Sequence, residues 1–457
     1  MKNNKQYLII LMLLIGLAGC DDFVEVDVPN SQLTGATVFE DKATANAALI
    51  ALLSKLRDNG LLTGKGNGSS HCLGMYADEL LYYGGADDNL VHLYNNTLLS
   101  TTSIVAQKWN ESYHQIYSAN AIIEGCQNST ALASTDRNQF IGEALFIRAL
   151  IHFYLVNIYG DIPYATTTNY ELNRLLTRMP TAEVYDKVIN DLDNAIGLLS
   201  ANYTSSERVR PNQSTAQALL ARVYLYKGDW AAASNAASAV INQSFYVMEP
   251  DISMVFLKGS TSAIWQFSPP SPNANTYEGE SFIFITGPPN NVSIRPEFYN
   301  SFDENDLRKS NWIAVKTNGS NTWYHAYKYK KRTVSNPPTE YSIVFRLEEM
   351  YLIRAEARAR QGELIGAKED LNAIRTRAGL LPTTALTQSE LVEAILKERS
   401  FELFTEFGHR FFDLKRTNAL ETILGVTKPS WDVNDRVWPI PEVEILANPN
   451  LTQNTGY

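Results

Sequence analysis

The chain has 457 residues, and its 39 basic and 49 acidic side chains give a formal charge of −10. Nucleic-acid binding depends on clustered basic residues, so this acidic balance argues against a nucleic acid as the partner. The hydrophobic share of 45% and the charged share of 19% are typical of a globular protein, and the length suits one broad domain or two closely packed lobes.

Residues 1–19 have the pattern of a secretory signal peptide, which is removed and takes no part in the fold. Lys2 and Lys5 form a basic start, and an apolar run from Tyr7 to Leu17 follows. A membrane-spanning helix needs about twenty apolar residues, roughly twice the length of this run. A transmembrane anchor is the alternative, but the run stops early at Gly19.

Leu17-Ala18-Gly19-Cys20 resembles a bacterial lipobox, in which the cysteine is acylated and becomes the first residue of the mature chain. Several acyl chains give a stable membrane anchor, whereas one chain binds only marginally. We therefore expect a lipid anchor at Cys20. The remaining cysteines, Cys72 and Cys126, could form one disulfide or stay as two buried thiols, and their spacing does not decide between these states.

After an extended leader over residues 20–42, apolar residues at three- and four-residue spacing predict a mainly α-helical domain over residues 43–457. We expect Thr181 to cap one of these helices. The alanine-rich pairs Ala216–Ile241 and Met350–Arg375 turn at Gly228-Asp229 and Gly362-Glu363, which is typical of tetratricopeptide-like helical hairpins, although generic helix pairs are the alternative. The expected single helices are Ala43–Leu56, Ile104–Cys126, Asp136–Ile158, Thr181–Leu199 and Gln388–Glu406.

We expect the helical framework to cover residues 104–244 and 340–425, with helices resuming at Glu340. Residues 57–103 and 245–339 are rich in loops, and such long non-helical stretches favour a ligand-side region. The expected short strands are Ala263–Phe267, Ser281–Thr286, Trp312–Lys316 and Thr322–Tyr329.

No pattern in the sequence asks for catalysis, a metal or a cofactor. Glu398, Glu402 and Glu406 recur every four residues, which predicts a solvated or ion-paired stripe on one helix rather than a catalytic pair. His409 lies beside Arg410 and the aromatic pair Phe411-Phe412, within a segment whose family resemblance, given below, implies a packing role. Gly64-Lys65-Gly66 lacks the flanking residues of a phosphate-binding loop, so we expect an ordinary loop there.

Four segments resemble the SusD/RagB family of outer-membrane nutrient-uptake lipoproteins, in the family's order. The last segment is the most specific, although Thr455 stands where the family usually has proline. The segments are "GEALFIRALIHFYLVNIYGDIPY", "RLEEMYLIRAEARARQGE", "ERSFELFTEFGHRFFDLKR" and "VWPIPEVEILANPNLTQNTGY".

The resemblance implies a tetratricopeptide-like helical half and an irregular half that carries the ligand surface. It implies a partner, a SusC-like TonB-dependent outer-membrane transporter over which the lipoprotein sits as a lid. It further implies that Asp21 and Asp22, directly after the lipidated cysteine, form the signal for export to the outer cell surface. Solvation of the tether is a second explanation for the two aspartates.

Tyrosines beside hydroxyl-binding side chains in the loop-rich region indicate a sugar-binding surface, because pyranose C–H faces stack on aromatic rings. Trp265 and Trp323 are expected in the core instead. The function predicted is capture of an oligosaccharide for import, without catalysis; a peptide-binding lipoprotein, a lipid-anchored glycoside hydrolase and a protein-binding helical scaffold are the alternatives. The candidate contacts are Tyr82, Tyr83, Asp88, Tyr94 and Tyr277.

Overall fold

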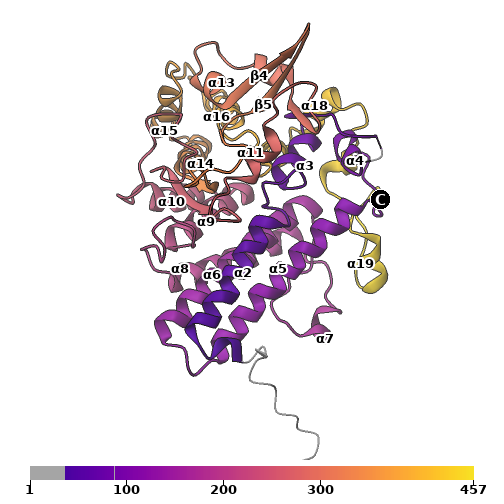
Figure 1. Cartoon of the computed structure of the whole chain (residues 1–457), viewed down its shortest axis with the longest axis vertical. Helices are drawn as coiled ribbons and strands as arrows, with labels where there is room; N and C mark the ends of the chain where they lie inside the picture. The colour runs from indigo at the N-terminus through magenta and orange to yellow at the C-terminus, as the bar shows by residue number, and fades with distance from the viewer. Residues whose placement is uncertain (1–36, 87) are drawn as a thin grey trace, which may run out of the picture.

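The structure is a computed structural model that describes residues 37–86 and 88–457 (Figure 1). Its framework consists of α2 (Lys42–Asp58), α5 (Ser103–Asn128), α6 (Ser134–Tyr159), α8 (Thr181–Leu198), α9 (Gln213–Lys227), α10 (Trp230–Ile241), α14 (Leu347–Arg360), α15 (Leu364–Arg377) and α16 (Gln388–Glu402). Each of these helices as far as α14 packs against the next, and α14 then contacts both α15 and α16. The prediction of a mainly α-helical, tetratricopeptide-like fold is confirmed.

Both predicted helical hairpins are present. Gly228 between α9 and α10 has φ +79°, and Gly362 between α14 and α15 has φ +83°, a backbone conformation that favours glycine at helix ends. Ala233 and Ala367 are fully buried where the second helix of each hairpin meets the first. Small side chains at these contacts let the paired helices approach closely.

α6 is the central helix of the framework. It is the one helix in the described part of the chain that is long and apolar enough to cross a membrane, and its most apolar window is completely buried inside the fold. Its neighbours α5 and α8 lie along it in the lower half of the molecule (Figure 1). The hydrophobic surface of α6 is therefore used for packing between helices.

The rest of the molecule is irregular and carries two small antiparallel sheets. One has the strand order β1 (Leu80–Tyr82), β3 (Val292–Ile294), β5 (Asn321–Ala326), β4 (Ile313–Asn318), and the other pairs β2 (Ala263–Phe267) with β6 (Ser342–Arg346). A second hydrophobic core, which includes Leu80, Ile294 and Trp312, packs beneath the larger sheet.

Short helices connect these strands to the framework and close the fold. In chain order they are η2 (Thr37–Phe39), α3 (Ser69–Tyr76), α4 (Leu90–Asn95), α7 (Tyr170–Asn173), α11 (Tyr277–Phe282), α12 (Pro296–Asn300), α13 (Leu307–Trp312), α17 (His409–Arg416), α18 (Leu420–Thr427), η3 (Val433–Arg436) and α19 (Glu442–Ala447).

Two assignments in the irregular region are wrong. The expected strand Ser281–Thr286 is instead the end of α11 and a loop, because the Thr276 hydroxyl accepts from the Gly279 amide at 3.0 Å and starts a helix. The helix expected from Glu340 begins only at Leu347. The apolar run before it forms the fully buried strand β6, which periodicity alone does not distinguish from a buried helix.

Two helix ends also differ from expectation. Thr181 does not cap α8; its amide and hydroxyl both donate to Asp161 Oδ1, at 2.8 and 2.9 Å, so the cap comes from a residue distant in sequence. α16 ends at Glu402 rather than Glu406, and Thr405 beyond it has the left-handed φ of +54°.

Candidate ligand-binding surface

The structure places the predicted ligand contacts in two separate locations. Tyr82, Asp88 and Tyr94 gather where β1 ends and α4 begins. Tyr277 lies against the loop that joins α2 to α3, where Lys65 meets its ring, and Tyr83 follows β1 and contacts Asn291. Cys20, Asp21 and Asp22 lie outside the described residues.

The Tyr82 group is packed as a structural cluster. The rings of Tyr82 and Tyr94 are 6.2 Å apart, and Lys428 Nζ lies 4.1 Å from the centre of the Tyr94 ring. The Asp88 carboxylate accepts from the Leu90 amide at 3.0 Å, and burial together with Asp88 raises the pKa of Tyr82 to about 12. These contacts use both rings and the carboxylate to brace β1 against α4.

Tyr277 is the first residue of α11 and is half-buried. Its hydroxyl donates to Asp58 Oδ1 at 2.9 Å, and Lys65 Nζ lies 4.6 Å from the centre of its ring. Burial and the Asp58 carboxylate raise the pKa of Tyr277 to about 12, so the phenol is neutral at physiological pH. The crevice beside it has a volume of only about 10 Å³, so the ring borders a shallow surface.

The α2–α3 loop connects Tyr277 to Tyr83. The Gly64 carbonyl accepts from Ser281 Oγ at 2.8 Å, which holds the loop against α11. A Cβ on Gly66 would lie 2.9 Å from the Asn291 amide nitrogen. The carbonyl of Asn291 in turn accepts from the Tyr83 amide at 2.7 Å. These contacts connect Tyr277, Lys65 and Tyr83 through the α2–α3 loop and Asn291; the elements α3 and α11 that flank the loop lie close together in Figure 1.

We call Tyr83, Lys65, Asn291 and Tyr277 the loop-side surface. Tyr83 is 37% exposed, and Ile285 beyond α11 is 67% exposed, so apolar area faces solvent here. Lys65 and Asn291 are not among the residues predicted from the sequence. The glycine–lysine–glycine sequence had marked the loop, but nothing in it indicated that Lys65 would meet a ring on α11.

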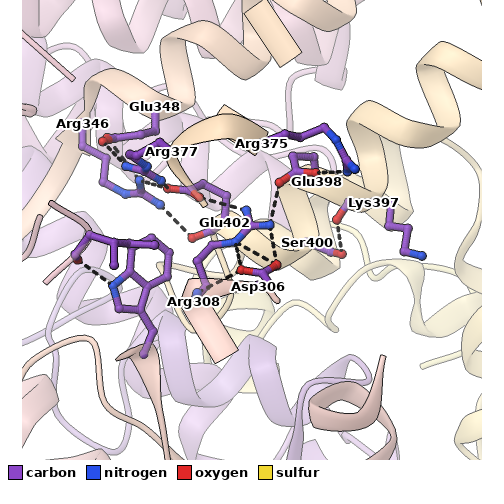
Figure 2. Close-up of polar contacts among 12 residues, drawn as sticks. Asp306, Arg308, Arg346, Glu348, Arg375, Arg377, Lys397, Glu398, Ser400 and Glu402 are labelled. Carbon is purple, nitrogen blue, oxygen red and sulfur yellow. Dashed lines mark hydrogen bonds and ion pairs between the residues drawn. The ribbon is translucent and has the colours of Figure 1, made fainter. Parts of the chain in front are cut away.

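The glutamates singled out in the sequence belong to a buried ion-pair network, of which Figure 2 shows Glu398 and Glu402. Glu402 receives guanidinium contacts from Arg308 at 3.1 Å, Arg346 at 2.6 Å and Arg377 at 2.5 Å. Glu398 pairs with Arg308 at 2.6 Å, and Glu406 pairs with Arg346 at 2.9 Å. The prediction of ion pairing is confirmed, whereas a solvated stripe is excluded because the three glutamates are buried.

The network also sets the protonation of these groups. Burial alone would raise the pKa of Glu402, but Arg377, Arg346 and Arg308 outweigh burial and hold its pKa below the usual range. Arg346 and Lys328 do the same for Glu406. Both carboxylates stay ionised and occupied by cations, so neither is suited to act as the proton donor of a glycoside hydrolase.

Buried histidines and cysteines serve packing. His71 stacks on Phe282 at 3.8 Å, and burial lowers its pKa to about 3. His409 is buried as predicted. Cys72 and Cys126 are both buried free thiols, so they form no disulfide, a point that their spacing in the sequence left open. Across residues 37–86 and 88–457, no group of three or more His, Cys, Asp or Glu side chains is arranged to hold a metal ion.

Larger hollows lie elsewhere on the molecule. One of about 530 Å³ is lined by residues that include Arg295, Lys397 and Arg410. Another of about 480 Å³, between α5, α7 and α19, is lined by residues that include Tyr113 and Tyr170. Neither contains a residue of the loop-side surface.

Comparison with known proteins identifies the family. A family model described as starch-binding, associating with outer membrane, matches residues 77–225, and the SusD family model matches residues 273–457. The chain belongs to the SusD/RagB family. It is 24% identical to the SusD-like protein P25 of Formosa agariphila, with 98% of this chain and 99% of the relative aligned.

Solved structures of SusD-like proteins share the fold of this SusD/RagB chain. A SusD superfamily protein from Parabacteroides distasonis matches with a TM-score of 0.78 and 24% identity, over 93% of this chain and 100% of that one. The surface glycan-binding protein A from Bacteroides thetaiotaomicron, in complex with laminarihexaose, matches with a TM-score of 0.76 and 20% identity, over 90% and 99%. Tyr83 lies in the first family-matched segment and Tyr277 in the second, whereas Lys65 lies outside both.

Proposed function

We propose that this SusD/RagB protein captures an oligosaccharide at the cell surface through its loop-side surface and delivers it, chemically unchanged, to a SusC-like TonB-dependent transporter. The observation that carries the proposal is the set of contacts that connects Tyr83, Asn291, Lys65 and Tyr277 on a SusD-type fold. Tyrosine faces can stack on the C–H side of a pyranose, and the amide and ammonium groups can bind its hydroxyls. The laminarihexaose complex of a structural relative supports a glycan as the ligand class.

The location we propose is the outer membrane, facing outward, with the chain anchored through acyl groups on Cys20. The family description "associating with outer membrane" supports this location. Asp21 and Asp22 would act as the export signal, and residues 43–457 would form a single ligand-binding domain above the 20–42 leader. Mass spectrometry of the mature amino terminus tests the anchor, since an unacylated chain or a different first residue would contradict it.

Binding without catalysis is supported by the buried network, because Glu398 and Glu402 are both engaged by arginines. Calorimetry of the purified protein against a panel of oligosaccharides and peptides tests the proposal. We expect at least one oligosaccharide to bind and no new reducing ends to form. Binding of peptides alone would favour the peptide-uptake alternative, and sustained release of reducing ends would favour a hydrolase.

Two variants locate the binding surface. Tyr83→Ala and Tyr277→Ala each remove one stacking ring, which contributes about 1 kcal/mol and should weaken binding roughly fivefold. Tyr170→Ala is the matched comparison, since Tyr170 on α7 is 73% exposed and lines the competing hollow between α5, α7 and α19; it should leave binding unchanged. Unchanged affinity in both test variants would move the site away from this surface.

A further inference from the structure

One basic side chain lies on Tyr277 and two more belong to the neighbouring segment. Lys65 lies above the Tyr277 ring, and residues 331–335 run alongside residues 273–279. Two contacts define this pairing. The Asn275 side-chain amide donates to the Thr333 carbonyl at 2.9 Å, and the Ser335 backbone amide donates to the Asn273 carbonyl at 2.9 Å. Gly279 of α11 lies directly against the Lys331 carbonyl. Lys331 and Arg332, both exposed, are thereby placed beside α11.

The side chains of Lys65, Lys331 and Arg332 form no ion pair within 4 Å in the described part of the chain, in contrast to Arg57 nearby, which is paired with Asp58 at 2.5 Å. Two acids lie close to them: Asp58 accepts from the Tyr277 hydroxyl beneath Lys65, and buried Glu340 accepts from the Lys331 backbone amide at 3.0 Å. Glu280 is the exposed acid of α11. Glu278 and Glu340 are buried, so the exposed charges beside α11 are mainly the cations, in a chain whose net charge is −10; we take their position beside the loop-side surface as a sign of the ligand's charge.

We infer that the loop-side surface selects an acidic glycan, one that carries uronate carboxylates or sulfate esters. This inference rests on the proposed function and names its ligand class. Lys65 covers one face of the Tyr277 ring, so a sugar that stacks on that face must first displace the ammonium group. A cation–π contact at an accessible ring is weak, and a charge-assisted hydrogen bond to a carboxylate or sulfate is stronger.

An acidic sugar therefore draws Lys65 away from the ring and exposes the face on which the sugar then stacks. A neutral sugar must lose the cation–π contact without a comparable replacement. Lys331 and Arg332 supply further positive charge next to α11 and would bind the acidic groups of adjacent sugar units. The surface consequently discriminates by charge as well as by shape.

The test is calorimetry of the full protein against four ligands. Oligogalacturonate and its methyl ester differ in carboxylate charge, sulfated carrageenan oligosaccharides carry sulfate esters, and laminarihexaose is neutral. We expect an acidic glycan to bind about tenfold or more tightly than the neutral ones, and its affinity to fall as salt rises from about 0.05 M to about 0.5 M. Lys65→Ala and the double variant Lys331→Ala/Arg332→Ala should remove most of this preference. Lys187→Ala, at an exposed position on α8, is the control and should retain it.

The outcomes distinguish failure of the charge preference from failure of glycan capture itself. Equal or tighter binding of the neutral glycans overturns the inference while leaving glycan capture in place. An acid preference that survives all the test variants also overturns it, because the charge would then be recognised elsewhere. Failure to bind any glycan, neutral or acidic, would refute the proposed function itself.

Discussion

Replacing Glu402 by glutamine removes the charge that three buried arginines share. Glu402 is fully buried, and the side chains of Arg308, Arg346 and Arg377 that contact it are at most 4% exposed. The glutamine amide would direct an N–H donor at guanidinium groups that are themselves donors. Removing one partner of a buried ion pair costs about 3–5 kcal/mol, because the remaining charges lose their compensation. We expect a loss of that size in the free energy of unfolding.

Urea denaturation followed by circular dichroism measures the change. The control is Glu171→Gln, which removes a surface ion pair to Arg174 whose two side chains are 70% and 51% exposed. Exposed pairs contribute less than about 1 kcal/mol, so the control midpoint should hardly move. Equal shifts in the two variants would refute the view that the network holds α14, α15 and α16 against the irregular half.

The same contacts predict a pH dependence. The pKa of Glu402 is lowered in the folded state, so its contribution to stability is present above the ordinary value of 4.5 and is lost as pH falls. Glutamine does not titrate, so the stability gap between wild type and Glu402→Gln should narrow in acid. A stability difference between wild type and Glu402→Gln that stays constant from neutral pH into strong acid would contradict a lowered pKa of Glu402.

Further predictions concern the loop-side region and the thiols. Gly64 lies directly over the Glu278 carboxylate, so Gly64→Ala should destabilise the fold by about 1–3 kcal/mol and weaken ligand binding. Gly85 has open space around it, so the control Gly85→Ala should do neither. Equal melting temperatures of the two variants would contradict this prediction. Burial raises the pKa of Glu278 to about 7, so ionisation of this carboxyl group lowers the stability of the fold as pH rises from 4.5 through 7. In urea titrations, Glu278→Gln should therefore be more stable than wild type at pH 8, by up to about 3 kcal/mol, and about equally stable below pH 4.5. Burial raises the pKa of Cys72 and of Cys126 to about 12, so both should react with a thiol reagent only after unfolding; rapid labelling of the native protein would show that they are accessible.

The long helices could be predicted because burial on one face imposes a repeat that the sequence displays. The segment Asp136–Ile158 became α6, Ser134–Tyr159, with ends within two residues of the expectation. The buried face is harder to predict in α2, where Ile50 is 47% exposed while Leu49 and Leu52 are buried. In an alanine-rich helix, a single large apolar residue changes which face is predicted to be buried.

Contacts between distant segments account for what could not be predicted. Asp161 caps α8 from outside the helix, and Lys65 meets Tyr277 only after α2 and α11 come together. Tyr82 and Tyr83 are adjacent in sequence, yet Tyr82 ends β1 with its ring near Tyr94, whereas Tyr83 lies beyond the strand and is 37% exposed. Composition identified the aromatic region, but only the folded chain separates rings that brace the fold from rings that face solvent.

A crystal structure of the protein with its tightest-binding oligosaccharide would test the central claim most directly. We predict a sugar ring within van der Waals distance of Tyr277 or Tyr83, and Lys65 turned toward an acidic group of the ligand. An oligosaccharide seated in the hollow between α5, α7 and α19, with the loop-side surface empty, would contradict the account.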